Sequence, residues 1–424
     1  MIRFLAKGLW RDRSRSLFPM LVVTAGVMLT VVLYSYLKGS ENDIVRTAAS
    51  FRTGHVDVVT HAYAAEQDQV PNDLALTGLE SLLTGLRAAH PQLAWTPRIH
   101  FVGLLDVPDE NGETRAQGPA MGLAVDLLSP GSPEPGILDL ERALVRGRLP
   151  TAAGEILLSD QFAHRLGLVP GGTVTLISAT MHGAMTTANF TLAGTVRFGV
   201  AAMDRGAVIA DVADVQQALD MVDAAGEVLG FFPDLVFRAD EVRAVADRFT
   251  AEHPETGDPF APVMRTLPER EGLGETLALA NAIGGAVVGL FVVVMSIVLW
   301  NAGLMSGLRR FGEFGVRLAI GEQKGHLYRT LLWESLLIGV VGSVLGTALG
   351  LAVARYLEVH GIDISPFLKN SSMMISDSLH ARITPVSWVI GLVPGLVATL
   401  LGTAIAGRGI YNRETARLTK ELQE

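Results

Sequence analysis

The sequence predicts an α-helical membrane protein with four transmembrane helices and a large α+β extracytoplasmic domain inserted between the first two helices. Only 18% of its 424 residues are charged, against about 25% in an ordinary soluble protein. Four stretches are apolar and long enough to cross a bilayer. One long polar stretch, residues 38–275, separates the first of them from the other three.

A helix needs about 20 apolar residues to cross the roughly 30 Å hydrocarbon core. Four segments meet this requirement, and we expect the spans at residues 17–37, 276–308, 330–356 and 383–407. The first apolar core is too long for a signal peptide, and no small-x-small cleavage site follows it, so we expect an uncleaved anchor. The second segment is longer than a bilayer requires, which predicts that it continues outward as a stalk.

The distribution of Lys and Arg predicts the orientation of these spans. Basic residues concentrate in three short segments that we therefore place in the cytoplasm, residues 1–16, 309–329 and 408–424. The domain at 40–275 holds 33 acidic and 16 basic residues, and we place it outside together with the loop 357–382. The start of the chain mixes Phe4, Leu5, Leu9 and Trp10 with basic residues. This pattern suits either an amphipathic helix on the membrane surface or a solvated basic segment.

Two parts of the external domain share a strand–helix–strand pattern, at about 55–105 and 233–266. In each unit, two predicted strands flank a segment whose apolar residues recur at helical spacing. In the second unit, 234–238 is the expected first strand. Together the two units predict an open sheet backed by two helices. Between them, about 108–230, short alternating segments and Gly-rich turns predict a β-rich insert.

Several classes of function are excluded or disfavoured by the residues themselves. The net charge of -9 disfavours nucleic-acid binding, which needs a basic surface. Without cysteine there is neither a disulfide nor a zinc–thiolate site. No P-loop, His-Glu-x-x-His or Gly-x-Ser-x-Gly motif occurs. His55, Asp57 and His61 share one strand face, which suits a solvated or packed face better than a metal site, since no fourth ligand can be proposed. We therefore predict neither catalytic, cofactor nor metal residues, and not an enzyme.

Small residues recur four apart within the predicted spans. Such spacing lets helix backbones approach closely, and we assign helix packing to Gly285, Gly289, Gly342, Gly346 and Gly350. Packing within the chain explains most of this pattern, while a second copy or a homologous permease is a further candidate partner.

Two other residues stand out within the predicted spans. Glu334 is an intramembrane acid, which must face a partner or reach the headgroups. Pro394 should kink the last span.

The short connection after the second span is the most informative stretch. It carries Asn301, the step Arg310-x-x-Glu313, a small-residue helix ending in Gly321, and Glu334 at the opening of the third span. In these features it resembles the FtsX-like/MacB-type permease family of ABC transporters (MacB, LolC/LolE, FtsX). The order of one span, a large external domain and three spans is similar too, as is the phrase at 155–174.

The resemblance implies a mechanism and a set of partners. A separate cytoplasmic ABC ATPase, which carries the ATP and Mg²⁺, would grip a coupling segment at Arg310, Glu313, Arg317, Gly321, Glu322 and Lys324. ATP-driven movement would then pass to a MacB-like periplasmic domain (mechanotransmission), in a multi-pass protein of the bacterial inner membrane. The implied role is lipoprotein release or export of an amphiphile, with a periplasmic carrier, adaptor or lipoprotein as further partner. The alternative is a non-transporting FtsX-like regulator of a periplasmic protein.

Overall fold

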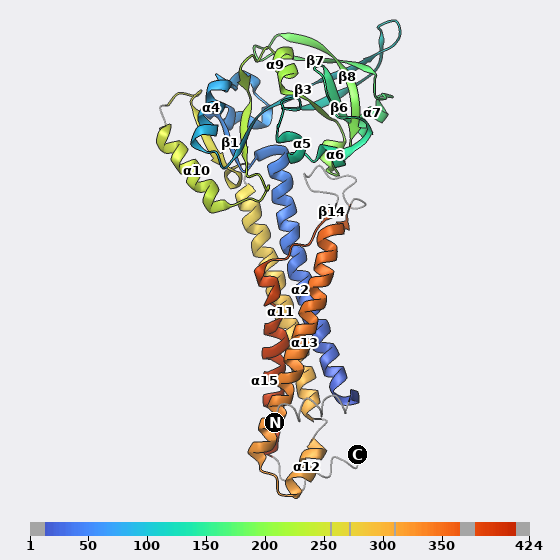
Figure 1. Ribbon diagram of the computed structural model, residues 1–424, viewed down its shortest axis with the longest axis vertical. Coiled ribbons are helices and arrows are strands. Elements are labelled where there is room, and N and C mark those ends of the chain that lie inside the picture. Colours follow the sequence, from blue (N-terminus) through green and yellow to red (C-terminus); the bar gives the residue numbers. More distant parts are fainter. Residues whose placement is uncertain (1–12, 255–256, 271–272, 309–310, 365–377, 413–424) are drawn as a thin grey trace. The chain divides into compact units, whose positions relative to one another are not determined.

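The computed structural model describes residues 13–254, 257–270, 273–308, 311–364 and 378–412 (Figure 1). The chain divides into two compact units. The helical unit comprises Met1–Asn42, Leu279–Ile362 and Leu379–Glu424, and the sheet unit comprises Asp43–Ala278 and Asp363–Ser378. Two long helices, α2 (Arg13–Ala48) and α11 (Leu273–Leu308), each contribute residues to both units. At these two places the chain passes between the units inside helices. It also passes between them within the short strands β13 (Ile362–Asp363) and β14 (Ser378–Leu379).

Within the described residues, four helical segments are long and apolar enough to cross a membrane: Leu17–Thr53, Leu277–Met305, Lys324–His360 and Pro385–Arg408. The third is one continuous helix, α13 (Lys324–His360). The fourth is broken into a 3₁₀ turn η5 (Pro385–Trp388), a π-helix η6 (Val393–Ala398) and α15 (Thr399–Asn412). Pro394 lies inside η6, because a proline cannot supply the backbone N–H that a regular α-helix needs there. The predicted kink thus takes the form of a π-helical turn.

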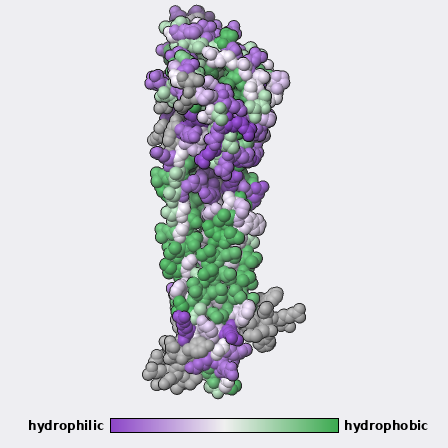
Figure 2. All heavy atoms as spheres, turned by 90° about the vertical axis from the view of Figure 1, so that its left-hand side faces the viewer, coloured by the Kyte–Doolittle hydropathy of each residue, from purple (hydrophilic) through white to green (hydrophobic). Residues whose placement is uncertain are grey.

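Apolar side chains cover the surface of the helical unit. Figure 2 shows one face on which hydrophobic residues dominate over the middle of this unit. On α11 alone the exposed large apolar residues include Leu279, Ile283, Val287, Leu290, Val293, Val294, Ile297 and Val298. A soluble protein rarely exposes so much contiguous apolar surface, so the unit is suited to lipid or to other helices.

The sheet unit contains an open antiparallel sheet in the order β12–β1–β11–β3. Its strands and covering helices are β1 (Val56–Thr60), α4 (Leu79–Ala89), β3 (Ala94–Pro108), β11 (Glu227–Phe231), α10 (Ala239–Glu252) and β12 (Pro262–Thr266). Each helix joins two strands of this sheet, which makes two split β-α-β units. Figure 1 shows α4 and α10 at this sheet.

The strand predicted at 234–238 is wrong. These residues form a turn and irregular backbone, and the third strand of the sheet is β11, seven residues earlier. Asp234 explains the shift, since its carboxylate accepts the backbone N–H of Val236 and pairs with Arg238, which stabilises a turn instead of a ladder. The boundary of the β-rich insert at 230 therefore falls inside the open sheet.

The remaining long strands close into a barrel. Its six strands pair in the ring β3–β4–β9–β6–β8–β7–β3. Their bounds are β4 (Thr114–Val125), β6 (Glu155–Ser159), β7 (Thr173–Ala179), β8 (Met185–Val196) and β9 (Ala207–Asp211). The first residues of β3 pair with β11 in the open sheet, and from Ile99 onward β3 pairs with β4. One strand thus joins the two sheets into a single body.

Short elements complete the chain. In the sheet unit they are η1 (Ala49–Thr53), α3 (His61–Glu66), η2 (Gln67–Gln69), η3 (Asn72–Leu74), β2 (Leu76–Thr77), α5 (Glu134–Ile137), α6 (Leu140–Ala143), β5 (Leu144–Gly147), α7 (Asp160–Arg165), α8 (Ala201–Asp204), α9 (Val212–Ala218), β10 (Ala224–Ala225) and η4 (Leu267–Glu269). Elsewhere lie α12 (Phe311–Ala319), β13 (Ile362–Asp363) and β14 (Ser378–Leu379). The side chain of Ser159 caps α7 by accepting the N–H of Phe162, as Ser does at helix starts.

Candidate functional site

The predicted coupling segment forms a helical elbow. Helix α12 ends at Ala319, a turn follows, and α13 begins at Lys324. Gly321 has a φ of 98°, and the turn carries two hydrogen bonds, from the N–H of Glu322 to the carbonyl of Arg317 and from the N–H of Gly321 to Leu318. This is a Schellman ending, which needs a residue in the left-handed region that glycine adopts without strain. The sequence thus fixes where the elbow turns.

The elbow presents apolar and basic side chains together. Ile320 is 81% exposed and Val316 is also exposed, while Arg317 lies 4.0 Å from the Glu322 carboxylate. His326 lies 3.8 Å from the same carboxylate. Such long, solvent-exposed ion pairs contribute little to stability, so these side chains remain free to meet another protein.

Two residues of the predicted coupling set are not described at the side-chain level. Arg310 lies outside the described residues, and Glu313 lies in α12 with its side chain outside the description.

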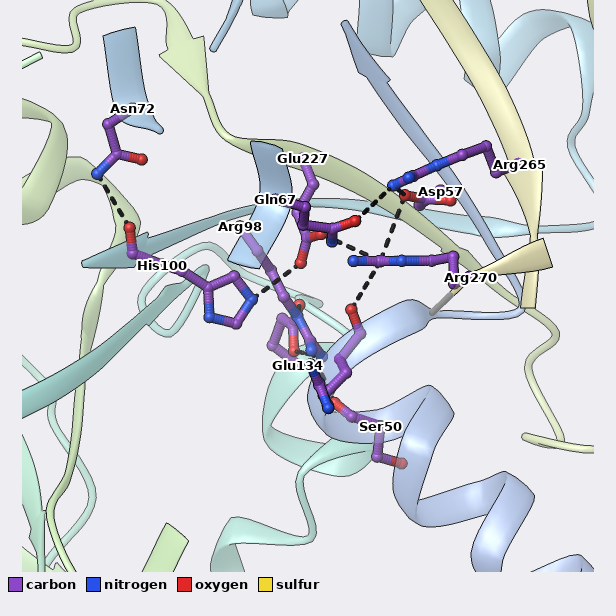
Figure 3. A network of polar contacts seen from close by, with 11 residues as sticks. Ser50, Asp57, Gln67, Asn72, Arg98, His100, Glu134, Glu227, Arg265 and Arg270 are labelled. Carbon is purple, nitrogen blue, oxygen red and sulfur yellow. Dashed lines mark hydrogen bonds and ion pairs between the residues drawn. The ribbon is translucent and has the colours of Figure 1, made fainter. Parts of the chain in front are cut away.

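A second polar constellation lies in the sheet unit and was not predicted from the sequence (Figure 3). We call its six charged residues the arginine clamp: Arg98, Arg265, Arg270, Asp57, Glu134 and Glu227. Five of them are buried and Arg265 is partly so. Three arginines balance three carboxylates, as buried charges must be paired to remain ionised.

Arg98 makes the best-formed contacts of the clamp. Its Nε lies 2.8 Å from Oε1 of Glu134, and its Nη2 lies 2.8 Å from Oε2. The two side chains therefore form a bidentate pair, and both are fully buried. The third nitrogen, Nη1, donates to the backbone carbonyl of Ser50 at 2.7 Å. Thr96 donates to the same Glu134 at 2.9 Å. Each of the three guanidinium nitrogens therefore donates at least one hydrogen bond.

Arg270 contacts the end of η1 and two carboxylates of the clamp. Its Nη1 donates to the carbonyl of Arg52 at 2.8 Å and lies 3.2 Å from Glu227 and 3.3 Å from Asp57. Glu227 also contacts Nε2 of His100 at 3.0 Å. Burial opposes ionisation of Glu227, but the charges of Arg270, His100 and Arg98 outweigh burial and lower its pKa to about 2. Burial raises the pKa of Asp57, although its two arginines act in the opposite sense.

The clamp fixes the chain where the two long helices meet the sheet unit. Ser50 and Arg52 belong to η1, the π-helical continuation of α2, and their carbonyls are at a helix C-terminus, where backbone oxygens lack helical partners and cations are favoured. Arg270 itself lies three residues before α11 begins. Two arginines thus tie the end of α2, and the residue that leads into α11, to strands β1, β3 and β11.

The glycines assigned to helix packing fall into two groups. A Cβ at Gly342, Gly346 or Gly350 would lie within 2.8 Å of α2 atoms, mostly of Val23, Val27 and Val31. Close backbone approach at these positions requires glycine. At Gly285 and Gly289 a Cβ would meet nothing within 4 Å among the described atoms, and packing at these two positions stays a prediction.

Glu334 is half-buried in α13, which begins at Lys324, so Glu334 is about 15 Å along the helix. It lines a small cavity of about 20 Å³ together with Pro19, Gly303, Ser335, Thr399 and Thr403. Ser335 and Thr403 hydrogen-bond at 2.9 Å beside it. Leu331 and Ile338 line the same cavity, so the acid lies beside a mixed apolar and polar space between helices.

The three residues considered as a metal site take unrelated positions. His55 is buried and accepts the N–H of Phe232 at Nδ1, and its ring lies against Phe231 and Phe232. Asp57 belongs to the clamp, and His61 begins α3. Within the part of the chain that the structure describes, no group of three His, Asp or Glu side chains could hold a metal ion.

Comparisons with known proteins match the part of the chain that contains the elbow. Residues 285–415 match the family model of the FtsX-like permease C-terminal domain. This part of the chain is therefore similar to the C-terminal domain of FtsX-like permeases. The macrolide export ATP-binding/permease protein MacB of Psychrobacter cryohalolentis is 25% identical over 158 residues, 37% of this chain and 23% of that protein. The uncharacterized ABC transporter permease YknZ of Bacillus subtilis is 26% identical over 115 residues, 26% of this chain and 29% of that one. The resemblance to FtsX-like/MacB-type permeases is thereby confirmed.

The matched segments span only about a quarter of the relatives' own length. Among solved structures, the periplasmic region of MacB from Actinobacillus actinomycetemcomitans aligns with 53% of this chain and 94% of its own at 12% identity, with a TM-score of 0.36.

Proposed function

We propose that this protein is the permease subunit of an ABC transporter whose ATPase is a separate cytoplasmic protein. The observation that carries the proposal is the FtsX-like permease match at 285–415. It contains the elbow, two of the four apolar helical segments and most of a third. In this proposal the four segments span the inner membrane, the elbow lies in the cytoplasm and the sheet unit lies in the periplasm.

The elbow is the part suited to an ATPase. Ile320 and Val316 offer apolar contact area and Arg317 offers a cation, and exposed apolar side chains rimmed by charge are typical of protein interfaces. A Schellman turn holds α12 at a defined angle to α13. A push on α12 would therefore move α13 rather than bend the loop.

Movement would reach the sheet unit through α2 and α11, because both helices run from one unit into the other. The arginine clamp supports this route, since it ties η1 and Arg270 to the strands by buried, charge-assisted hydrogen bonds. A flexible connection between these helices and the strands would absorb the movement, whereas a rigid connection transmits it to the sheet unit. We therefore propose mechanical transmission from ATP hydrolysis to periplasmic movement, without an ATP site in the described permease domain.

The proposed cargo is an amphiphile or a lipoprotein taken from the outer leaflet or the periplasm. The names of the MacB relatives, which are macrolide exporters, and the size of the sheet unit support transport. A periplasmic carrier or adaptor and a second permease copy complete the proposed assembly.

Deletion of residues 312–325 tests the elbow as the ATPase site. We expect the deletion to abolish co-purification of an ABC ATPase from native membranes. The paired substitutions Arg317→Glu and Ile320→Asp should do the same without removing backbone, and Met185→Asp, at an exposed site of the sheet unit, serves as control. An ATPase that still co-purifies with both elbow variants would refute the coupling assignment.

A further inference from the structure

A groove of about 590 Å³ opens beside strand β3, which is within the size range of ligand sites. The segment that carries η3 contributes Asn72 and Asp73 to one wall. The end of β7 and the turn that follows it contribute residues 178–183, and Val102 of β3 also lines the groove. Strands and a turn, rather than helices, therefore shape this groove.

The edge of β3 beside the groove lacks a neighbouring strand. On this edge β3 pairs with β11 up to Arg98 and with β7 from Leu104 onward. Within the described chain, residues 99–103 pair with β4 alone, on the opposite edge. This gap corresponds to about 17 Å of strand. An open strand edge offers N–H and C=O groups with which another extended chain can pair.

Strand β7 leaves β3 at the same place. Their last pair joins Ile177 to Leu104, although β7 continues to Ala179. The register would place Ala179 opposite Val102, but that pair is not formed, and both residues line the groove. The two strands therefore diverge here, and each presents a backbone edge to the groove.

Side chains occupy the two carbonyls of β3 that face the gap. The carbonyl of His100 accepts a hydrogen bond from Nδ2 of Asn72 at 3.0 Å (Figure 3), and that of Val102 accepts one from the hydroxyl of Ser178 at 2.8 Å. A residue in an antiparallel ladder directs its N–H and C=O to the same side, so the N–H groups of His100 and Val102 face the gap too. A carbonyl oxygen can accept a second hydrogen bond, so these side chains leave room for a further donor.

The walls of the groove favour an occupant with apolar and cationic side chains. Val102 is 56% exposed and offers an apolar contact. Asp73 is exposed on one wall, and on the other His182 lies 3.9 Å from the carboxylate of Asp220. The surrounding domain, residues 40–275, holds 33 acidic and 16 basic residues. A basic segment is therefore the complementary occupant.

We propose that this groove docks an extended, basic peptide segment of a partner protein, which adds as a short strand between β3 and β7. Its backbone would hydrogen-bond to Val102 and Ala179, one of its apolar side chains would pack on Val102, and a Lys or Arg would face Asp73. Strand addition takes its affinity from backbone hydrogen bonds and its specificity from alternate side chains. This inference does not rest on the proposed transport function, since the groove lies wholly within the sheet unit.

Disulfide tethering tests the proposal on the full chain in lipid nanodiscs. The chain has no cysteine, so His182→Cys, at a side chain that is 68% exposed, supplies a single attachment point at the groove. The probe is the peptide Cys-Gly-Gly-Lys-Val-Thr-Val-Lys-amide. The matched probe is methylated on the backbone nitrogens of its Val, Thr and Val, which then cannot donate hydrogen bonds. A short linker gives an effective concentration of about 1 mM, so weak binding is detectable.

Hydrogen exchange measures the outcome on peptides that cover residues 99–104 and 177–181. We expect the unmethylated probe to slow exchange there about fivefold relative to the methylated probe, the effect of one net hydrogen bond. Equal exchange with the two probes would overturn strand addition. This comparison uses one protein variant with two probes, so a change in folding cannot produce the difference.

Two further variants test the charge of the occupant. Asp73→Lys should remove most of the protection, because it places like charges together, and a probe with Glu in place of its two Lys should restore it. Asp247→Lys, at an exposed acid of α10 outside the groove lining, is the matched control and should leave the protection unchanged. Protection that survives Asp73→Lys in full would overturn the preference for a basic segment.

Discussion

Replacing Arg98 with methionine should destabilise the sheet unit strongly. The substitution removes both 2.8 Å contacts to Glu134 and the 2.7 Å hydrogen bond to the Ser50 carbonyl. Glu134 would stay fully buried, with the hydroxyl of Thr96 as its remaining side-chain partner among the described residues. Breaking a buried pair by removing one member costs about 3–5 kcal/mol, because it leaves an uncompensated charge. We expect a loss of this size in the free energy of unfolding.

Hydrogen exchange of peptides from β3 and β11 measures this loss locally, in the full chain. A change of about 3–5 kcal/mol corresponds to roughly 10²–10⁴-fold faster exchange through global unfolding of the unit. The double variant Arg98→Met with Glu134→Met should recover most of the protection, since apolar side chains replace a buried pair well. Arg148→Met, which breaks the exposed pair with Glu155, is the control and should change little.

The interpretation fails if Arg98→Met changes exchange less than tenfold, or if the double variant exchanges faster than the single one. Either result would mean that the clamp residues do not act as a coupled set.

Two further predictions concern pH and helix packing. Burial lowers the pKa of His55 to about 4. Above pH 6.5 His55 is neutral in both the folded and the unfolded chain, so it does not reduce the free energy of unfolding. As pH falls from 6.5 to 4 the unfolded chain takes up the proton first, and the free energy of unfolding falls by about 3 kcal/mol. His55→Asn should flatten the decline in melting temperature over that range; an unchanged slope would contradict the assignment. Gly346→Val should loosen the helical unit by about 1–3 kcal/mol, because its Cβ would lie 2.6 Å from the Thr24 carbonyl. Gly284→Val meets open space among the described atoms and should melt like wild type. A larger loss for Gly284→Val than for Gly346→Val would refute the packing.

Both helices and three of the four strands of the open sheet were predictable, because each strand–helix–strand unit is a local run of the chain; the fourth strand, β11, was misplaced. Extended segments around leucines at helical spacing indicate β1, α4 and β3 without knowledge of tertiary contacts. The barrel was not predictable beyond its β content, because β3 pairs with β7 some 70 residues later. Pairing over such distances leaves no periodic signal in the sequence.

The arginine clamp was missed for a specific reason. Thr96, Arg98 and His100 alternate with apolar residues on β3, a pattern that ordinarily indicates a solvent-facing side. Here η1 and α5 cover that side, and only the partner carboxylates, distant in sequence, make the burial of Arg98 tolerable. The elbow was predictable, because Gly321 and the charged residues around it act within one turn of the chain.

The central claim is that the sheet unit and the elbow lie on opposite sides of the membrane. The chain has no cysteine, so single cysteines at Met185 (82% exposed) and Ile320 (81% exposed) report accessibility without background. With a membrane-impermeant maleimide we expect Met185→Cys to react from the periplasmic side and Ile320→Cys to react only after the inner membrane is opened. Labelling of both positions from the same side would contradict the account.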